Sequence, residues 1–216
     1  KSTGVNLVEI ATKVMLGQSL AQQGIQELRL PEKPIWYVKA PAFSFAKLGG
    51  MDTYLSPEMK STGEAIGYDR KLNRALYKAL QASGIKMKEY GTVIVTLADE
   101  DKEEGLPLAR RFYQMGFNIE ATEGTAAFLK KHGIRTRVRR KLSDGSNEIL
   151  TSIQTGFVSY ILNTRSIFSR EHYDDGRAIR ECAVRNGVNT FTSLDTARIV
   201  LDALEEVIPE IHTIDE

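Results

Sequence analysis

The chain has 216 residues, of which 42% are hydrophobic and 26% are charged, which is the composition of an ordinary globular protein with ample material for a core. Its 29 basic and 28 acidic residues nearly cancel, so no overall charge favours nucleic acid or an anionic membrane as a partner. No run approaches the roughly 20 apolar residues of a membrane-spanning helix, and no signal peptide is visible. The single cysteine, Cys182, excludes an internal disulfide and suits a reducing cytoplasm.

The first seventy or so residues have an irregular pattern that predicts a small α+β segment. Apolar residues at helical spacing predict an amphipathic helix over Val5–Met15, and Ser19–Gln23 is expected to begin a second short helix that Gly24 ends. Ile35–Val38 has the composition of a strand. Asp69–Ser83 is predicted to form a helical connector to the rest of the chain.

From about residue 85 onward, predicted strands alternate with predicted helices. The expected strands are Thr92–Leu97, Asn118–Ala121, Arg135–Lys141, Val158–Leu162 and Val188–Phe191. The expected helices are Lys102–Met115, Thr125–His132, Glu148–Thr155, Glu171–Asn186 and Ser193–Val207. This alternation predicts an α/β fold, namely a doubly wound and mainly five-stranded parallel sheet with helices on both faces.

Polar residues follow these strands where a doubly wound sheet binds its ligands, beyond the carboxyl ends. The candidate ligand-binding residues are Lys102, Thr122, Thr125, Lys141, Asn163, Thr164 and Arg165. Lysine charge and threonine and asparagine hydrogen bonds suit a phosphate and its ribose. The strand-to-helix junction Thr122–Thr125 is the best single candidate, because the free N–H groups of a helix start bind anions. Threonine and glycine also cap helices that bind nothing, so that alternative stays open.

A basic cluster occupies the same region. Its members are Lys130, Lys131, Arg135, Arg137, Arg139, Arg140 and Lys141. Few aromatic residues lie between them, so a solvated face or a small-anion site is favoured over an RNA surface. Neither a dinucleotide-binding nor a P-loop glycine motif is present, the three histidines show no metal-ligand spacing, and no Ser–His–acid set can be assembled. The sequence therefore predicts a binding site without a catalytic or metal-binding set.

Several strings carry a resemblance to a known family. The sequences PEMKSTGEAIG at 57–67, KSTGV at 1–5 and ATKVMLGQSL at 11–20 resemble the end of the ATP-grasp portion of carbamoyl phosphate synthetase large subunits. Behind them, EATEGTA at 120–126 and LNT at 162–164 resemble the methylglyoxal-synthase-like regulatory domain that closes the same subunit.

The resemblance implies three segments: a C-terminal ATP-grasp tail at 1–69, a connector helix at 70–84 and an allosteric domain at 85–216. Because the chain starts with Lys1 rather than Met, we expect it to begin inside a longer polypeptide. The parent would be a cytoplasmic, glutamine-hydrolysing, ATP-dependent ligase that uses ATP with Mg or Mn and serves pyrimidine and arginine synthesis. Its catalytic carboxylates would lie upstream, which would leave this fragment inactive and without a cofactor of its own.

The resemblance also implies a nucleotide effector at the strand ends. Lys102, Thr122, Thr125 and Lys141 match the family's phosphate-contacting positions, and Asn163 matches its asparagine after the fourth strand. The implied effectors are UMP as inhibitor and phosphoribosyl pyrophosphate as activator, with IMP as a further candidate. The implied protein partners are the upstream ATP-grasp domains, the glutaminase small subunit and further copies of the subunit; nucleic acid and membranes are not expected partners.

Two positions depart from the family pattern. Arg165 stands where relatives often have threonine, and its extra guanidinium favours a more highly phosphorylated ligand such as phosphoribosyl pyrophosphate. Ala40 stands where ornithine-activated relatives have glutamate, so ornithine activation is not expected. The expected mechanism is a population shift between two arrangements of domain and tail, transmitted through Asp69–Ser83 and a turn at Ser61–Glu64.

Two alternatives remain open. A free-standing triose-phosphate lyase would share the fold and would need Asp99 or Asp101 as its catalytic carboxylate. A purely oligomer-forming domain could use Phe128, Phe168 or Phe191 for its contacts.

Overall fold

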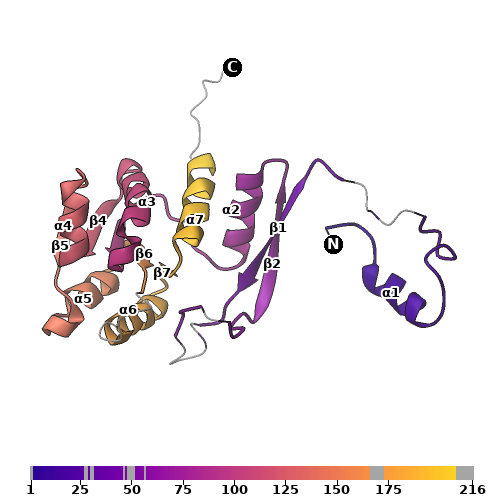
Figure 1. Ribbon diagram of the computed structural model, residues 1–216, viewed down its shortest axis with the longest axis horizontal. Coiled ribbons are helices and arrows are strands. Elements are labelled where there is room, and N and C mark those ends of the chain that lie inside the picture. Colours follow the sequence, from indigo (N-terminus) through magenta and orange to yellow (C-terminus); the bar gives the residue numbers. More distant parts are fainter. Residues whose placement is uncertain are drawn as a thin grey trace, which may run out of the picture.

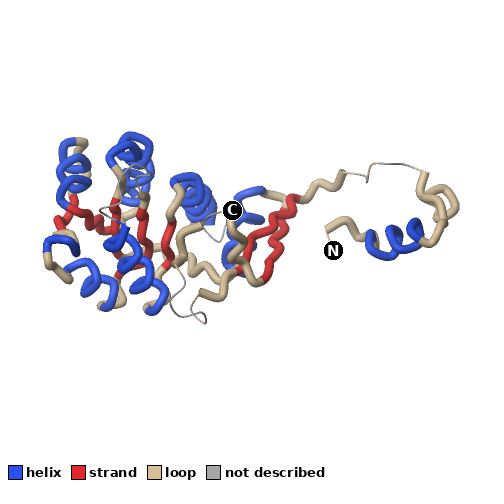
Figure 2. The backbone as a smooth tube through the Cα atoms, turned by 60° about the horizontal axis from the view of Figure 1, so that its bottom comes forward, coloured by secondary structure: helices blue, strands red, loops and turns tan. Residues whose placement is uncertain are grey.

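A computed structural model describes residues 2–26, 29, 32–45, 47, 52–55, 57–165 and 173–207. Among the residues outside these ranges are Lys1 of the KSTGV string, Phe168 of the proposed oligomer contacts, His172 and His212. The described chain has an α/β part and, on one side of it, a β-hairpin with its own helix (Figures 1 and 2).

The centre of the α/β part is a parallel five-stranded sheet in the order β5-β4-β3-β6-β7. Its strands are β3 (Thr92–Thr96), β4 (Asn118–Thr122), β5 (Thr136–Arg139), β6 (Val158–Asn163) and β7 (Asn189–Phe191). The five predicted strands are confirmed, with ends that differ by a few residues. The largest difference is β5, which covers only four of the seven residues predicted as strand.

Helices cover both faces of this sheet (Figure 2). They are α3 (Lys102–Gln114), α4 (Glu123–Lys131), α5 (Glu148–Gln154), α6 (Tyr173–Arg185) and α7 (Leu194–Val207). Alternate residues of β3 serve the two faces: Val93 and Val95 pack in a cluster with α3, α4 and α7, and Ile94 packs in a cluster with α5 and α6. The doubly wound fold predicted from the sequence is therefore the observed one.

The N-terminal part contains α1 (Leu7–Met15), β1 (Trp36–Ala42), β2 (Gly63–Asp69) and α2 (Leu72–Ala82). Strands β1 and β2 pair antiparallel with Ala40 opposite Ala65. Helix α2 packs against β2 on one side and against α7 on the other, so it joins the hairpin to the α/β part. Helix α1 lies away from both in Figure 1 and buries none of its residues.

Two predictions for this part were wrong. Ser19–Gln23 forms hydrogen-bonded turns rather than a helix, because five residues with Gly24 behind them are too few to sustain one. The turn predicted at Ser61–Glu64 is also absent, since Gly63 and Glu64 already belong to β2 and the Thr62 N–H donates to the Ala42 carbonyl at 2.9 Å.

The stretch between α2 and β3 is fastened to the sheet by Tyr160 of β6. Its hydroxyl accepts from the Lys88 N–H at 2.6 Å and donates to the Lys88 carbonyl at 2.8 Å. Burial raises the pKa of Tyr160 to about 12, so the hydroxyl stays protonated and can serve both bonds. An ion pair between Lys71 and Glu206 at 3.1 Å adds a second link, between the start of α2 and the end of α7.

We predict that Gly67→Ala will detach α2 from the hairpin. A Cβ at Gly67 would lie 2.3 Å from the Ala75 carbonyl oxygen and 2.3 Å from the Ala79 nitrogen, so the helix backbone must move. We expect the free energy of unfolding to fall by about 1–3 kcal/mol in urea titrations. Gly63→Ala in the same strand is the control, because its Cβ would meet only the Ala42 Cβ at 3.9 Å. Equal effects of the two substitutions would contradict the close-packing argument.

Candidate functional site

A cavity of about 310 Å³ lies at the carboxyl ends of the sheet strands. It is lined by residues that follow β3, β4, β5 and β6, and by one side of α6. Five of the seven predicted ligand-binding residues line it: Thr122, Lys141, Asn163, Thr164 and Arg165. Lys102 and Thr125 are not among the lining residues. The parallel register thus brings together residues up to 43 positions apart, as the strand-end argument predicted, from Thr122 to Arg165.

Asn163, the last residue of β6, holds two elements together. Its Nδ2 donates to the Thr96 Oγ1 of β3 at 2.7 Å, and its Oδ1 accepts from the Arg180 Nη1 of α6 at 2.7 Å. The side chain is 5% exposed. Asn163 therefore positions the wall of the cavity, with both ends of its amide engaged in the protein.

Two threonines fix the loop that follows β3. Thr164 Oγ1 accepts from the Ala98 N–H at 3.0 Å, and Thr125 Oγ1 accepts from the Leu97 N–H at 3.3 Å. Thr125 is 1% exposed, so its hydroxyl faces the interior rather than the cavity. These residues shape the site by holding Leu97 and Ala98 in place.

The start of α4 lies directly at the cavity. Helix α4 begins at Glu123, immediately after β4 ends at Thr122, so the four-residue loop expected between strand and helix is absent. Thr122 is the N-cap and its side chain makes no capping hydrogen bond. The first N–H groups of this nine-residue helix have no intrahelical acceptors, which favours an anion beside Thr122.

Lysine and arginine side chains surround this helix start. Lys141 follows β5 and lines the cavity half-buried, and Arg165 follows β6 with its guanidinium carbon 4.6 Å from the centre of the Tyr54 ring. Lys102 lies beside Gly124, where a Cβ would be 3.5 Å from its Nζ, and pairs with Asp99 at 2.5 Å. The site thus combines cations from three strand ends with a helix start.

The basic cluster predicted around residues 130–141 is divided by the fold. Arg139 forms a two-bond ion pair with buried Glu120, whose carboxylate also accepts from Ser152 at 2.7 Å. Burial tends to raise the pKa of Glu120, but the hydrogen bonds from Arg139 and Ser152 hold it below its ordinary value. Arg140 pairs with Glu148 at 2.8 Å. Of the cluster, only Lys141 lines the cavity.

Several residues of the site were not predicted, among them Thr96 and Asp175 of the cavity lining, and Arg180 and Asp52. Arg180 of α6 lines the cavity, and its Nε and Nη2 donate to the Oδ1 and Oδ2 of Asp52, each at 2.7 Å. Burial tends to raise the pKa of Asp52, but the hydrogen bonds from Arg180 and from the Tyr54 N–H hold it below its ordinary value. A charged residue next to Ile179 on the buried side of α6 was the available signal for Arg180. Nothing in the local sequence marks Asp52.

Two comparisons with known proteins gave a match. Residues 104–192 match the family described as the MGS-like domain, and the chain contains that domain, as the second part of the resemblance implied. A crystal structure of ForH is similar at a TM-score of 0.41 and 18% sequence identity, covering 54% of this chain and 80% of that one.

The described residues contain no helix with the length and apolar character needed to cross a membrane. In the same part of the chain, no group of three or more His, Cys, Asp or Glu side chains could hold a metal ion.

We predict that Asn163→Ala will loosen the cavity wall. The substitution removes two buried hydrogen bonds and leaves Arg180 Nη1 and Thr96 Oγ1 without this partner. We expect a loss of about 1–3 kcal/mol in the free energy of unfolding, measured by urea titration. Asn118→Ala is the control, since it removes an exposed amide at the opposite end of the sheet, and it should cost less than about 0.5 kcal/mol. A loss for Asn163→Ala no larger than that of the control would show that the wall does not depend on this amide.

Proposed function

We propose that the cavity binds the phosphate group of a nucleotide or phosphoribosyl effector, and that this domain senses such effectors rather than catalysing a reaction. The observation that carries the proposal is the meeting of the α4 N-terminus with Lys141 and Arg165 in one cavity. Backbone N–H groups at a helix start and flexible cations together recognise phosphate without requiring any particular base. The remaining volume, within about 310 Å³, suits a ribose attached to that phosphate.

We further propose that the chain is the C-terminal part of a carbamoyl phosphate synthetase large subunit. This proposal is supported by the MGS-like domain at 104–192 and by the PEMKSTGEAIG string at 57–67, whose end forms β2. In that setting UMP would inhibit and phosphoribosyl pyrophosphate would activate, with IMP as a further ligand. ATP with Mg or Mn, the upstream ATP-grasp domains and the glutaminase subunit would belong to the whole enzyme, which would act in the cytoplasm.

An effector role also fits the surroundings of Asp99 better than the lyase alternative does. Asp99 lines the cavity, as a catalytic carboxylate would have to, but its side chain is 91% exposed and paired with Lys102. A carboxylate this exposed is surrounded by water, whereas a base that acts on a bound triose phosphate has to be shielded from water. Phosphate release from dihydroxyacetone phosphate by the purified chain would contradict the effector proposal.

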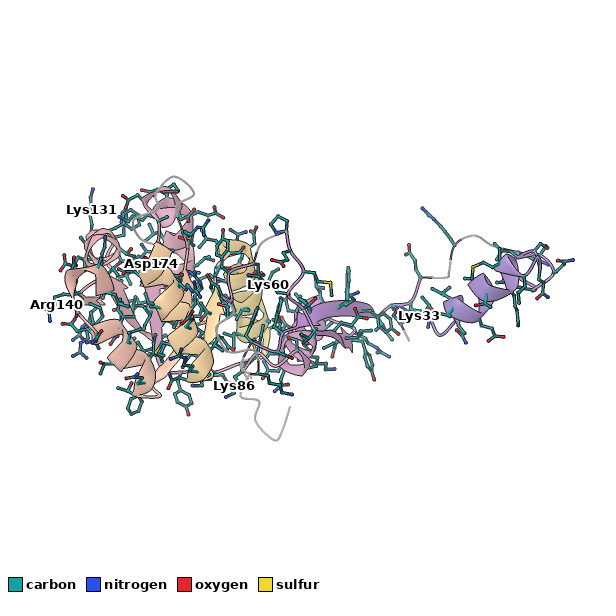
Figure 3. The ribbon with its side chains drawn as sticks, turned by 90° about the horizontal axis from the view of Figure 1, so that it is seen from below. Lys33, Lys60, Lys86, Lys131, Arg140 and Asp174 are labelled. Carbon is teal, nitrogen blue, oxygen red and sulfur yellow. The ribbon has the colours of Figure 1, made fainter. Side chains whose placement is uncertain are left out.

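We predict that Lys141→Ala weakens UMP binding about ten-fold or more in calorimetric titrations. The lysine would supply a charge-assisted hydrogen bond to the phosphate, and such bonds contribute about 1.5–3 kcal/mol. Lys131→Ala is the matched control, because Lys131 is exposed at the far end of α4 and points away from the molecule in Figure 3. An equal loss in both variants would mean that general charge, not the cavity, drives binding.

We predict that Arg165 favours the ligand with more phosphate groups. Arg165→Ala should weaken phosphoribosyl pyrophosphate binding about ten-fold and UMP binding much less, because only the former offers a second phosphate group for the guanidinium. Arg165→Lys keeps the charge and should lose only part of the preference. The measurement is the ratio of the two dissociation constants for each variant, and an unchanged ratio in Arg165→Ala would rule out this role.

A further inference from the structure

A segment from the N-terminal part of the chain lies against the cavity. Residues 52–55 precede β2 in sequence, yet Asp52 contacts Arg180 of α6, which is 128 positions away. Tyr54 follows it, and its ring lies 4.6 Å from the guanidinium carbon of Arg165 and 5.6 Å from that of Arg180. The two arginines at the cavity therefore share contacts with one short segment that belongs to neither strand ends nor helices of the α/β part.

The guanidinium of Arg180 donates hydrogen bonds on two sides. Nε and Nη2 point to the two carboxylate oxygens of Asp52, and Nη1 points to Asn163. The first pair is the fork geometry with which arginine binds a carboxylate or a phosphate equally well. The Arg180 side chain is 1% exposed and that of Asp52 is 14% exposed, so the carboxylate screens the arginine from solvent.

We propose that Asp52 is an internal competitor for the anionic group of the ligand: a phosphate that reaches Arg180 displaces the Asp52 carboxylate and releases the segment at residues 52–55. This inference rests on the proposed function of the cavity as a phosphate-binding site. A ligand gains Arg180 only by displacement, because the arginine has almost no exposed surface while Asp52 is seated. A phosphate placed beside a seated Asp52 would also meet a like charge, whereas exchange of one anion for the other leaves the arginine paired.

Release of residues 52–55 would change contacts that these residues make with the hairpin part of the chain. Lys60 donates through Nζ to the Asp52 carbonyl at 3.1 Å and to the Tyr54 carbonyl at 2.6 Å, and β2 begins three residues later at Gly63. Figure 3 shows Lys60 where the hairpin part adjoins the α/β part. A movement of residues 52–55 is therefore passed to β2 through a short, hydrogen-bonded stretch, which makes the segment a physical link between ligand and hairpin.

The first test compares UMP and inorganic pyrophosphate binding to the unsubstituted chain and to Asp52→Asn by calorimetry. The neutral amide competes less for the arginine, so we expect the dissociation constant of Asp52→Asn to be at least about five-fold lower. Asp195→Asn removes one negative charge from an exposed ion pair with Arg198 in α7 and should leave affinity unchanged, which controls for net charge. Weaker binding by Asp52→Asn would mean that Asp52 supports the site, and would overturn the proposal.

A second measurement needs no substitution and stays valid if Asp52→Asn fails to fold. The Tyr54 N–H donates to Asp52 Oδ1 at 3.1 Å, so hydrogen exchange of the peptide containing Tyr54 should accelerate at least three-fold when UMP saturates the chain. Unchanged or slower exchange with UMP bound would overturn the displacement proposal alone. Absence of binding by the unsubstituted chain and by Asp52→Asn would overturn both this proposal and the effector function.

Discussion

A chain of buried and partly buried hydrogen bonds, from Thr96 through Asn163 and Arg180 to Asp52, is the interaction on which the rest of the site depends. It starts at the end of the central strand β3, crosses to the end of β6, continues into α6 and finishes in the N-terminal part of the protein. Asn163 and Arg180 each bond to a neighbour on either side in this chain, so the position of the cavity wall depends on the docking of residues 52–55. In a low-dielectric setting such a chain is strong when complete and costly when any partner is lost.

The sheet could be predicted from sequence because its central strands β3 and β6 are buried on both faces. Burial of every residue in β6 and four of five in β3 leaves continuous apolar runs that few other structures produce. Strand β2 was missed for the opposite reason: it has one covered face, and its pattern is interrupted by Gly63 and Gly67, the second of which is required by the close approach of α2. The residues of β2 suit its packing against α2 more than they suit the general preference of strands for β-branched and aromatic residues.

The site was predictable as far as strand order determines it. Parallel strands bring their carboxyl ends to one edge, which is why Thr122, Lys141, Asn163, Thr164 and Arg165 meet. Which of these side chains face a ligand was not predictable, since Thr125 and Asn163 are used inside the protein. The contact between Asp52 and Arg180 spans 128 positions and has no local pattern, so only tertiary structure shows it.

The arrangement has a consequence for regulation that follows from linkage. If a phosphate and the Asp52 carboxylate exclude each other at Arg180, then anything that draws residues 52–55 away from the cavity raises the affinity for the ligand. By reciprocity, the ligand favours the withdrawn segment by the same factor, with couplings of this kind amounting to about 1–3 kcal/mol. The hairpin is the element that this coupling would reach, because Lys60, three residues before β2, holds the segment by two hydrogen bonds. Helix α2 in turn packs against both the hairpin and α7. Only an anion that reaches Arg180 gains differential affinity for one state, so displacement of the Asp52 carboxylate, rather than occupancy of the helix start, produces the coupling.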